Sequence, residues 1–431
     1  MIPSWMQAAA IEFEMAHAPR PFVPGETPIP PSGKVIGGSE IQNAMFALMD
    51  NVLTEGPWVA RFEEMLASRV GVKHASMCNS GSSANLLAVS ALKSHWLHPE
   101  RRLHDGDVVV TTAVGFPTTL NAILHARLRP VFIDVELETL VPADDNILGA
   151  VHKFDARAVV LAHTLGNPWP LSVVDLLDVM DVYVIEDNCD ALGSLYQGRM
   201  TGGFGTLATQ SFYPAHHITT GEGGAVLTNS QTLKRAVESL RDWGRDCWCP
   251  PGKDNTCGKR FEWRFADGSL PEGYDHKYVY SEVGYNLKST DLQAAIGVAQ
   301  LDRLGGFTRA RRERFDHLFS GLRDLSDYFI LPQETAGSRP SWFGFPLTCT
   351  ERIRRSDVLA LLAERKIGTR NLFGGNLLRQ PAYHGMFEAD GRLPNSDIIT
   401  ERTFWIGCWP GLTPDMLNFI VEALHDACKN R

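Results

Sequence analysis

The chain has 431 residues, of which 44% are hydrophobic and 21% are charged, and its formal net charge at pH 7 is −9. A mildly acidic chain of this composition argues against a disordered protein and against one that coats nucleic acid or an anionic membrane. No apolar run reaches the roughly 18 residues of a membrane span, and residues 1–20 contain no apolar signal-peptide core. These features predict a cytoplasmic protein with more than one domain.

Residues 1–35 are expected to form an N-terminal arm. A short amphipathic helix is predicted over 4–17. The proline-rich stretch 19–31 is expected to be extended, because proline cannot continue a helix. A disordered tail is the alternative interpretation of this composition.

From about residue 40, helices are predicted to alternate with short β-branched strands. The predicted strands span 108–112, 131–135, 158–162 and 182–185, and a further strand is predicted over 225–229. Apolar runs of this length between helices indicate a parallel sheet covered on both faces, and ligands bind such sheets at the carboxyl ends of the strands. The large domain is expected to span residues 36–305.

The rest of the chain departs from this alternation. Residues 244–280 are rich in Gly, Asp, Pro and Cys and are predicted to form a long ordered loop, a kind of segment that is usually functional or disordered. A helix is expected over 290–304. A second, arginine-rich helix after 306 is expected to lead into a small α+β domain over 306–431.

Small polar residues gather at the start of a predicted helix in 79–85, which reads Asn-Ser-Gly-Ser-Ser-Ala-Asn. Free backbone N–H groups and hydroxyls at a helix start form an anion site that suits a phosphate. An ordinary helix N-cap explains the same residues, so both interpretations stay open for this motif alone.

Asp187 follows the predicted strand 182–185 in the run Val-Ile-Glu-Asp-Asn-Cys-Asp. A carboxylate at the carboxyl end of a buried strand can pair with the protonated ring nitrogen of a vitamin B6 cofactor, and this pairing keeps the ring acting as an electron sink. A helix-capping aspartate is the alternative for Asp187 taken alone.

Two further motifs complete an ordered set of four. Ser211-Phe-Tyr-Pro-Ala-His216 precedes Gly221-Glu-Gly-Gly, and Gly-Tyr-Asn286-Leu-Lys follows later. Together the four motifs resemble the DegT/DnrJ/EryC1/StrS family of sugar aminotransferases, from about residue 30 to near the end. The resemblance implies an α/β protein with the aspartate aminotransferase fold of fold type I pyridoxal phosphate (PLP) enzymes. That fold has a large domain with a mainly parallel seven-stranded sheet and a small α+β C-terminal domain.

The resemblance also implies cofactor-binding roles for Gly81, Ser82, Ser83, Phe116, Asp187, Asp190, Ser211 and Asn286. The small residues at the helix start and Ser211 would hold the cofactor phosphate, whereas Phe116 would stack on the ring. Asp187 would pair with the ring nitrogen. Asn286 would reach the phosphate of the neighbouring subunit, which implies a homodimer. Asp190 stands where the family usually has glutamine, and this departure sets the chain apart.

His216 is the larger departure, because the family has its cofactor-tethering lysine at this position. Imidazole cannot keep a stable Schiff base to an aldehyde, so the cofactor is expected to bind untethered, as pyridoxamine 5′-phosphate (PMP). With an unperturbed pKa of about 6.5, histidine can take a proton near neutral pH. His216 is therefore the expected catalytic base of a dehydration. The alternative is that His216 or His217 is structural and another lysine serves.

Four of the eight cysteines form a spaced set, with 57, one and seven residues between neighbours: Cys189, Cys247, Cys249 and Cys257. Four thiolates can hold a 2Fe–2S cluster or a zinc ion, although a Cys-x-Cys pair is unusual in structural zinc sites. The remaining cysteines show no such grouping and are expected to be small buried hydrophobes: Cys78, Cys349, Cys408 and Cys428.

With His216 and this cysteine spacing, the chain resembles the iron–sulfur branch of the family, the CDP-4-keto-6-deoxyglucose 3-dehydrases. The resemblance implies C-3 deoxygenation of a nucleotide-linked 4-keto-6-deoxyhexose in deoxysugar biosynthesis, with PMP and a 2Fe–2S cluster. The chain has no recognisable flavin or nicotinamide motif. A separate NAD(P)H-dependent iron–sulfur flavoprotein reductase or a ferredoxin system is therefore the expected partner, docking near 247–257. A dTDP-sugar dehydrase of the same type, a PLP-dependent sugar aminotransferase and a non-catalytic zinc protein are the alternatives.

The segment 370–384 resembles the part of the family that contacts the substrate. Its polar residues are the candidates for nucleotide recognition: Arg370, Asn371, Asn376, Arg379 and Gln380. Solvent-exposed polar residues without a binding role are the alternative. These residues do not distinguish a CDP sugar from a dTDP sugar.

Overall fold

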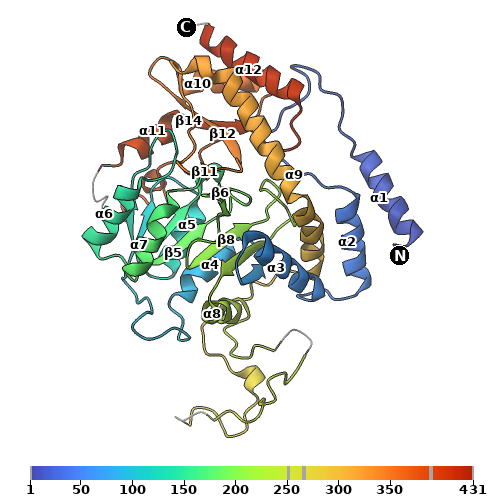
Figure 1. Cartoon of the computed structure of the whole chain (residues 1–431), viewed down its shortest axis with the longest axis vertical. Coiled ribbons are helices and arrows are strands. Elements are labelled where there is room, and N and C mark those ends of the chain that lie inside the picture. The colour runs from blue at the N-terminus through green and yellow to red at the C-terminus, as the bar shows by residue number, and fades with distance from the viewer. Residues whose placement is uncertain (1, 250–252, 265–267, 388–391, 430–431) are drawn as a thin grey trace.

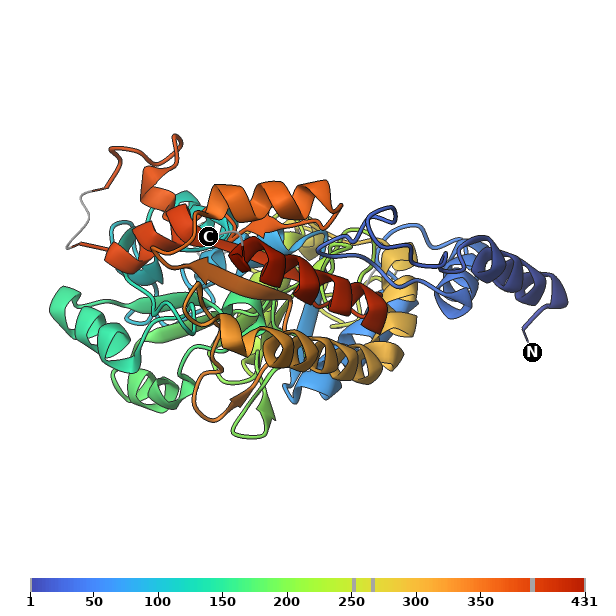
Figure 2. The ribbon, with the colours of Figure 1, turned by 90° about the horizontal axis from the view of Figure 1, so that it is seen from above.

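The computed structural model describes residues 2–249, 253–264, 268–387 and 392–429. Figure 1 shows a central sheet covered by helices, a long diagonal helix beside it, a C-terminal unit above it and a loop segment that extends below. Seen from above, helix α1 (Ser4–Ala16) extends from one side of the body (Figure 2). None of the described helices combines the length and the apolar character needed to cross a membrane.

The central sheet has seven strands in the order β1-β9-β8-β5-β4-β2-β3. These strands are β1 (His74–Cys78), β2 (Val108–Thr112), β3 (Arg129–Ile133), β4 (Ala158–Ala162), β5 (Tyr183–Asp187), β8 (Leu207–Ser211) and β9 (Gly224–Thr228). The strands from β8 to β3 run parallel to their neighbours. Strand β9 lies antiparallel to both β8 and β1. The predicted mainly parallel sheet is confirmed.

The predicted strands differ in how well they match the sheet. Those at 108–112 and 158–162 coincide with β2 and β4. The one predicted at 131–135 is two residues late, because Arg129 already pairs with Val108 of β2. Strands β1 and β8 escaped prediction, since His-Ala-Ser-Met-Cys and Leu-Ala-Thr-Gln-Ser lack the β-branched runs that mark a strand.

Helices cover both faces of this sheet. They are α3 (Pro57–Val70), α4 (Gly81–Ala91), α5 (Pro117–His125), α6 (Asp144–Phe154), α7 (Val174–Val179) and α8 (Gln231–Arg241). Helix α2 (Gly38–Met49) packs instead on α1 and on α9 (Asp291–Leu322). Ile185 of β5 belongs to the core that includes Leu87 of α4 and Leu233 of α8. Its neighbour Val184 belongs to the opposite core with Ile147 of α6. The alternation along β5 therefore fills both cores, as in a sheet buried on both faces.

One continuous helix, α9 (Asp291–Leu322), replaces the two helices expected over 290–304 and after 306. It begins with a capping box, in which the Thr290 hydroxyl accepts a hydrogen bond from the Gln293 N–H at 3.3 Å. The expected break at 305–306 is wrong, because each helical glycine costs only about 1 kcal/mol relative to alanine. Contacts with α2, α3 and the C-terminal unit hold the whole helix together.

Gly305→Ala and Gly306→Ala are each expected to raise the free energy of unfolding by about 0.5–1 kcal/mol. Both glycines are exposed within α9, and an added Cβ would meet no atom within 4 Å. Urea denaturation measures the effect. Gly297→Ala is the matched control in the same helix, since its Cβ would lie 2.6 Å from the Phe62 ring. This control is expected to destabilise, and a common sign for all three variants would contradict the explanation.

The C-terminal unit is an antiparallel sheet with helices, in the strand order β10-β12-β14-β13. Its elements are β10 (Phe329–Ile330), β12 (Gly344–Cys349), α10 (Arg355–Glu364), β13 (Arg370–Asn371), α11 (Pro394–Arg402), β14 (Thr403–Gly407) and α12 (Pro414–Lys429). A three-stranded sheet of β6 (Leu195–Tyr196), β7 (Arg199–Met200) and β11 (Ser338–Arg339) joins it to the large domain. Phe345 and Phe404 share their core with Leu318 of α9. This agrees with the expected small α+β unit.

The N-terminal residues pack on the rest of the chain. Glu14 of α1 accepts a hydrogen bond from the Gly38 N–H at 2.7 Å, which links α1 to α2. Further along, Ile29 is buried in the core of the C-terminal unit, and the Pro30 carbonyl accepts a hydrogen bond from Trp409 Nε1 at 3.0 Å. These contacts favour an ordered arm over a disordered tail.

Candidate active site

The candidate site lies at the carboxyl ends of the neighbouring strands β5 and β8. Strand β5 ends at Asp187 and β8 ends at Ser211. The start of α4 lies against the same place, because a Cβ on Gly81 would lie only 2.5 Å from the Cβ of Ser211. Only glycine fits so close to Ser211, so the structure brings together two of the residues expected to hold a phosphate.

The start of α4 supports both interpretations of 79–85. Ser80 is the N-cap, and its hydroxyl accepts a hydrogen bond from the Ser83 N–H at 3.1 Å. Ser82 is exposed and Ser83 is partly exposed. The first turn of the 11-residue helix thus combines backbone N–H groups with hydroxyls beside Ser211, which is the chemistry of an anion site.

Asp187 is buried and its carboxylate is surrounded by donors. Asn85 Nδ2 donates to Oδ2 at 2.8 Å, the Thr119 hydroxyl donates to the same oxygen at 2.6 Å, and the Thr209 hydroxyl lies 3.4 Å from Oδ1. No helix begins in the described residues 188–194, so the helix-capping alternative is wrong. The donors hold Asp187 as a fixed carboxylate at the strand end.

The three side chains that surround the Asp187 carboxylate were not among the site residues predicted from the sequence. Asn85, Thr119 and Thr209 come from α4, α5 and β8, and only the fold brings them to Asp187. Asn85 offered a signal, because it is a polar residue of the motif 79–85 that directly precedes the apolar stretch Leu86–Val89 of α4. Thr119 and Thr209 offered none, since buried threonines are common in such elements.

His216 follows β8 and lies between two aromatic rings. Its ring centroid is 6.5 Å from that of Tyr213 and 5.1 Å from that of Phe343. Its Nδ1 lies 3.5 Å from Asp190 Oδ1, and its backbone carbonyl accepts a hydrogen bond from Arg311 at 3.3 Å. The structure therefore pairs the two residues at which the sequence departs from the family pattern.

The electrostatics of this pair favour two uncharged groups. Burial and, to a lesser extent, the positive charge of Arg311 together lower the pKa of His216 to about 4. Burial, together with the carboxylate of Asp187, raises the pKa of Asp190 to about 8. At neutral pH a neutral imidazole therefore faces a largely protonated carboxyl group. A neutral imidazole has the free lone pair that a proton acceptor needs.

Asp190→Asn is expected to flatten the pH dependence of stability in the cofactor-free protein. The folded pKa of about 8 lies above the ordinary value of 3.8, so the folded state binds more protons in this range and loses stability as the pH rises from about 4 to 8. Between pH 5 and pH 8 the wild type should lose about 2–4 kcal/mol more than the variant. Urea denaturation at both pH values measures this difference, and equal losses would contradict the raised pKa.

His217, next to the candidate base, has a structural role. Its ring is buried and its Nε2 lies 2.6 Å from the Ser341 carbonyl oxygen.

Phe116 is the N-cap residue of α5, is 54% exposed and meets Phe373 edge-on at 6.1 Å. An exposed ring at the start of a helix is available to stack on a ligand, and stacking by Phe116 stays a prediction.

Asn286 lies at the base of the loop 244–280, beside Leu287, whose carbonyl accepts a hydrogen bond from the Asn79 N–H at 2.9 Å. There its backbone bridges to Asp242, and its side chain is exposed. Lys288, the lysine of the same motif, pairs with Asp242 at 3.2 Å and lies over the Trp243 ring. The role of Asn286 toward a neighbouring subunit stays a prediction.

The spaced cysteines fall into two places. Cys189 lies in the site, with its Sγ 4.0 Å from the Thr209 hydroxyl, and burial and the carboxylates of Asp187 and Asp190 hold its pKa well above the ordinary value. The other three line one small hollow in the loop: Cys247, Cys249 and Cys257. Among the described residues, no three His, Cys, Asp or Glu side chains are arranged to hold a metal ion. One chain therefore does not bring the four thiols together, and these residues do not fit a cluster within a single chain.

The cysteines outside this set match their expectation. Cys78, Cys349, Cys408 and Cys428 are buried free thiols. Burial raises the pKa of each, as expected for unreactive small hydrophobes.

The candidate substrate residues already have protein partners. Asn376 is buried and caps a short 3₁₀ helix by accepting a hydrogen bond from the Leu378 N–H at 3.1 Å. Arg379 pairs with Glu401 at 2.9 Å, and Gln380 donates to the Gly374 carbonyl at 2.8 Å. Arg370 and Asn371 form the exposed strand β13. The structural role is established for Asn376, while nucleotide recognition by the segment stays a prediction.

The model of the DegT/DnrJ/EryC1/StrS aminotransferase family matches residues 35–425. The lipopolysaccharide biosynthesis protein RfbH of Salmonella typhimurium is 50% identical over 415 residues, covering 95% of this chain and 94% of that protein. The dTDP-4-dehydro-2,6-dideoxy-D-glucose 3-dehydratase of Saccharopolyspora spinosa is 50% identical over 409 residues, covering 94% and 87%.

Solved structures agree with the fold. The E. coli GDP-4-keto-6-deoxy-D-mannose-3-dehydratase with bound hydrated PLP matches with a TM-score of 0.81 at 25% identity, over 92% of this chain and 99% of that chain. The predicted resemblance is confirmed. The chain belongs to the DegT/DnrJ/EryC1/StrS aminotransferase family and has the aspartate aminotransferase fold.

Proposed function

We propose that this chain is a PMP-dependent nucleotide-sugar 3-dehydrase, which removes the C-3 hydroxyl of a nucleotide-linked 4-keto-6-deoxyhexose. The observation that carries the proposal is His216, a neutral imidazole beside Asp190 where the family has its tethering lysine. Relatives named as sugar 3-dehydratases, acting by name on a dTDP-linked and a GDP-linked sugar, support it.

The residues at the site fit PMP. Gly81 and Ser211 form a cradle that a larger side chain would fill. The Asn85 amide, the Thr119 hydroxyl and the Cys189 backbone N–H all donate to the buried Asp187 carboxylate and orient it. The exposed ring of Phe116 offers a stacking surface. When bound, PMP supplies an amine that can condense with the keto group and a ring that accepts electrons.

His216 is proposed to act as the general base. In the proposed tautomer the imidazole hydrogen is on Nδ1, which faces Asp190 Oδ1 at 3.5 Å, so Nε2 has the free lone pair that accepts the proton. Asp190 is proposed as the positioning residue that fixes the ring. With Arg311 close by, the imidazole stays neutral until it takes a proton. The same protonated ring can then assist departure of the C-3 hydroxyl as water.

Deoxygenation needs more than this elimination. Converting C–OH to C–H and releasing water consumes two electrons and two protons. A separate NAD(P)H-dependent iron–sulfur flavoprotein reductase or a ferredoxin system is the proposed source of the electrons. The spacing of Cys189, Cys247, Cys249 and Cys257 is the ground for a 2Fe–2S cluster as second cofactor.

A turnover assay with CDP-linked and dTDP-linked 4-keto-6-deoxyglucose, PMP and a reductase tests the proposal. Loss of the C-3 oxygen, detected by mass spectrometry, is the expected result, with the CDP sugar as the proposed substrate and the dTDP sugar as the alternative. Borohydride treatment of the holoenzyme is the companion experiment. A lysine–pyridoxyl adduct together with an amino-sugar product would show a true aminotransferase instead.

A further inference from the structure

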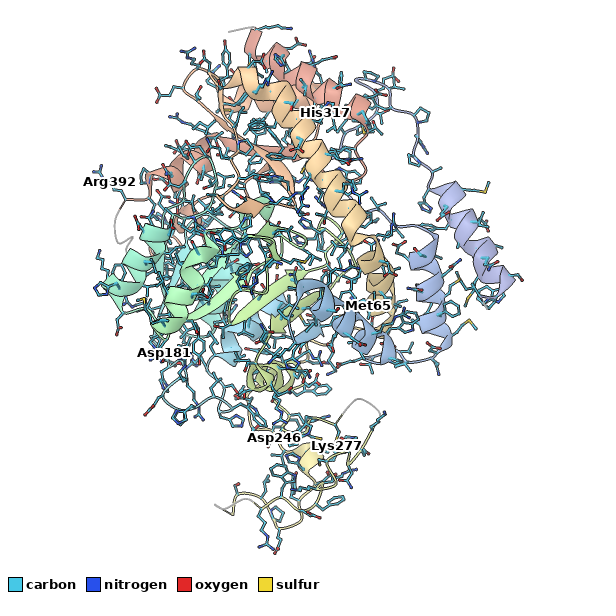
Figure 3. All side chains as sticks on the ribbon, viewed as in Figure 1. Met65, Asp181, Asp246, Lys277, His317 and Arg392 are labelled. Carbon is cyan, nitrogen blue, oxygen red and sulfur yellow. The ribbon has the colours of Figure 1, made fainter. Side chains whose placement is uncertain are left out.

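Helix α9 places a buried arginine behind the proposed base. Arg311 lies on this helix, which runs diagonally beside the sheet in Figure 1, and Figure 3 labels His317 further along it. Arg311 is only 1% exposed and is among the largest fully buried side chains of the described residues. A guanidinium is almost never fully buried unless it is paired, because it loses its hydration. The burial of this charge therefore needs a compensating interaction.

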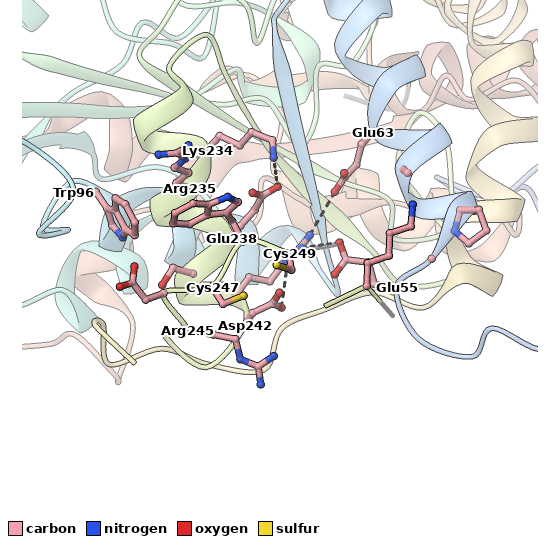
Figure 4. A pocket seen from close by; sticks show the side chains of 18 residues that line it. Glu55, Glu63, Trp96, Lys234, Arg235, Glu238, Asp242, Arg245, Cys247 and Cys249 are labelled. Atoms are coloured by element: carbon pink, nitrogen blue, oxygen red, sulfur yellow. Dashed lines mark hydrogen bonds and ion pairs between the residues drawn. The ribbon is translucent and has the colours of Figure 1, made fainter. Parts of the chain in front are cut away.

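A second buried arginine shows the usual compensation. Arg241 lines the cavity of about 570 Å³ that Figure 4 shows, and it pairs there with Glu55 at 2.7 Å and Glu63 at 3.4 Å. In the described part of the chain, Arg311 has no such carboxylate partner. Its hydrogen bonds go to three backbone carbonyls, and burial lowers its pKa to about 10. Packed apolar side chains can often replace a buried charge without loss of stability, so packing alone does not explain an arginine here.

The three carbonyls belong to the two segments that surround the His216 ring. One terminal nitrogen of Arg311 donates to the His216 carbonyl at 3.3 Å. The other donates to the carbonyls of Trp342 and Phe343, at 3.1 and 3.3 Å, directly before β12. The Phe343 ring is the one that packs on the imidazole, with 5.1 Å between the ring centroids. Arg311 thus fixes both the backbone of the proposed base and the aromatic ring beside it.

Phe343 is also held from its other side. Its N–H donates to the Leu165 carbonyl at 2.8 Å, and its ring lies 5.4 Å from that of Trp405. Leu165 is buried and has a left-handed backbone, with a φ of 51° that is uncommon for a residue other than glycine. Such a conformation persists only where the surrounding structure determines it, and it is frequent at active sites. The ring that His216 packs on is therefore part of a rigid junction.

The charged groups around His216 act in opposite directions. After burial, the positive charge of Arg311 lowers the pKa of His216, whereas the Asp187 carboxylate raises it. Asp190 faces Nδ1 at 3.5 Å, and the ring of Tyr213 lies on another side. His217 adds no positive charge at neutral pH, because burial holds its pKa well below the usual value. Of these groups, Arg311 supplies the positive charge that opposes protonation of the imidazole.

We infer that Arg311 is a positioning residue for the proposed base: it holds His216 against Phe343 and keeps the imidazole unprotonated in the resting site. This role rests on the proposed function, because Arg311 acts through His216. The charge and the hydrogen bonds contribute separately. The charge sets the pH range in which His216 is a free base, and the three hydrogen bonds set where its ring lies.

Two substitutions separate these contributions. Arg311→Lys keeps the positive charge but loses the planar fork that reaches three carbonyls. Arg311→Gln keeps an amide donor but loses the charge. Arg312→Gln is the matched control on the same helix. Arg312 also donates to three backbone carbonyls at 2.9 to 3.0 Å, none of them from the His216 segment: those of Gly193, Arg339 and Pro340.

The first measurement is independent of turnover. The full chain, prepared with isotope-labelled histidine, is titrated by NMR, and the His216 signal is assigned from its loss in His216→Asn. Arg311→Gln is expected to raise the pKa of His216 by about 1, the low end of the effect of a nearby charge. The pKa rises because removing a positive charge favours the protonated imidazole. Arg311→Lys and Arg312→Gln should leave the pKa of His216 unchanged.

The second measurement is the pH profile of kcat with PMP and the sugar substrate. In Arg311→Gln the fall of kcat on the acid side should move to higher pH by the same amount as the pKa. In Arg311→Lys this fall should stay at the wild-type pH, while kcat drops about 10- to 100-fold at unchanged KM, because a displaced base loses its alignment. Arg312→Gln should change neither the profile nor kcat.

The outcomes that overturn this role are distinct from failure of the proposed function. An unchanged pKa of His216 in folded Arg311→Gln, or an equal change in Arg312→Gln, would leave Arg311 as a structural anchor only. If Arg311→Gln does not fold, as judged by circular dichroism, Arg311→Lys decides alone, and a wild-type kcat in that variant overturns the role. Full turnover of His216→Asn would instead overturn the proposed base, whatever the titration shows.

Discussion

His216→Asn is expected to slow C-3 elimination, with a loss of turnover of about 10²- to 10⁴-fold, the usual contribution of a general base. Asparagine keeps a polar group of similar reach but cannot take a proton near neutral pH. The rest of the site is formed by other elements: Asp187 ends β5 and Gly81 begins α4. PMP binding should therefore survive within a few fold, so that the loss lies in kcat.

The measurement combines oxygen loss from the sugar with PMP affinity and iron content. If the proposed cluster is present, iron should stay at the wild-type level, because His216 lies among Tyr213, Phe343 and Asp190 and not beside the three cysteines of the loop 244–280. His217→Asn is the matched control. Its ring is buried against the Ser341 carbonyl, so the expected effect is a lower melting temperature rather than a selective loss of kcat. A joint loss of iron, PMP and stability in His216→Asn would show that His216 is structural.

His216→Lys is the complementary variant, because it should create a covalent bond between the chain and the cofactor. A lysine amine at this position, next to the ends of β5 and β8, should tether PLP covalently as the family lysine does. Borohydride reduction and mass spectrometry should then find the pyridoxyl adduct at position 216, whereas the wild type should show none. An adduct at the same lysine in both proteins would mean that another residue holds the cofactor.

The order of the four motifs along the chain was enough to predict the fold and the position of Asp187, Ser211 and Gly81 in the site. Asp187 and Ser211 lie where the rule for parallel sheets places ligand-binding residues, at the carboxyl ends of adjacent strands. Gly81 was predicted as part of a phosphate loop, and the structure adds the reason why it is glycine, its contact with Ser211. These residues could be predicted from the sequence because each motif combines a local pattern with a fixed place in a known topology.

The residues that surround Asp187 could not be predicted in this way. Asn85 is 102 residues away from it in the chain and Thr119 is 68 residues away, so their hydrogen bonds depend on how α4 and α5 pack. The cysteine spacing had a similar limit. It indicated four thiolates but carried no information about which of them one chain can bring together. Cys189 is fixed by β5, whereas the loop that carries Cys247 is directed outward.

Asp187→Asn is expected to lower turnover by about 10²- to 10³-fold while leaving the protein folded. The carboxylate would pair with the protonated ring nitrogen, and removing one partner of a buried charge pair costs about 3–5 kcal/mol. The amide should still fit its surroundings. Its oxygen can accept from Asn85 and Thr119, as Oδ2 does now, while its NH₂ can donate to the Thr209 hydroxyl, which already donates to Asn85 Oδ1 at 2.7 Å.

This isosteric fit separates the chemical role of Asp187 from its structural one. Unfolding midpoints should change little, PMP affinity should fall only modestly because the phosphate cradle is intact, and kcat should carry most of the loss. Asn85→Ala is the informative companion, since it removes a donor at 2.8 Å but keeps the charge, so it should cost turnover far less than Asp187→Asn. Turnover of Asp187→Asn within threefold of the wild type, with PMP bound, would show that the Asp187 charge does not support the ring nitrogen. The strand-end carboxylate would then be only a hydrogen-bonding centre for α4, α5 and β8.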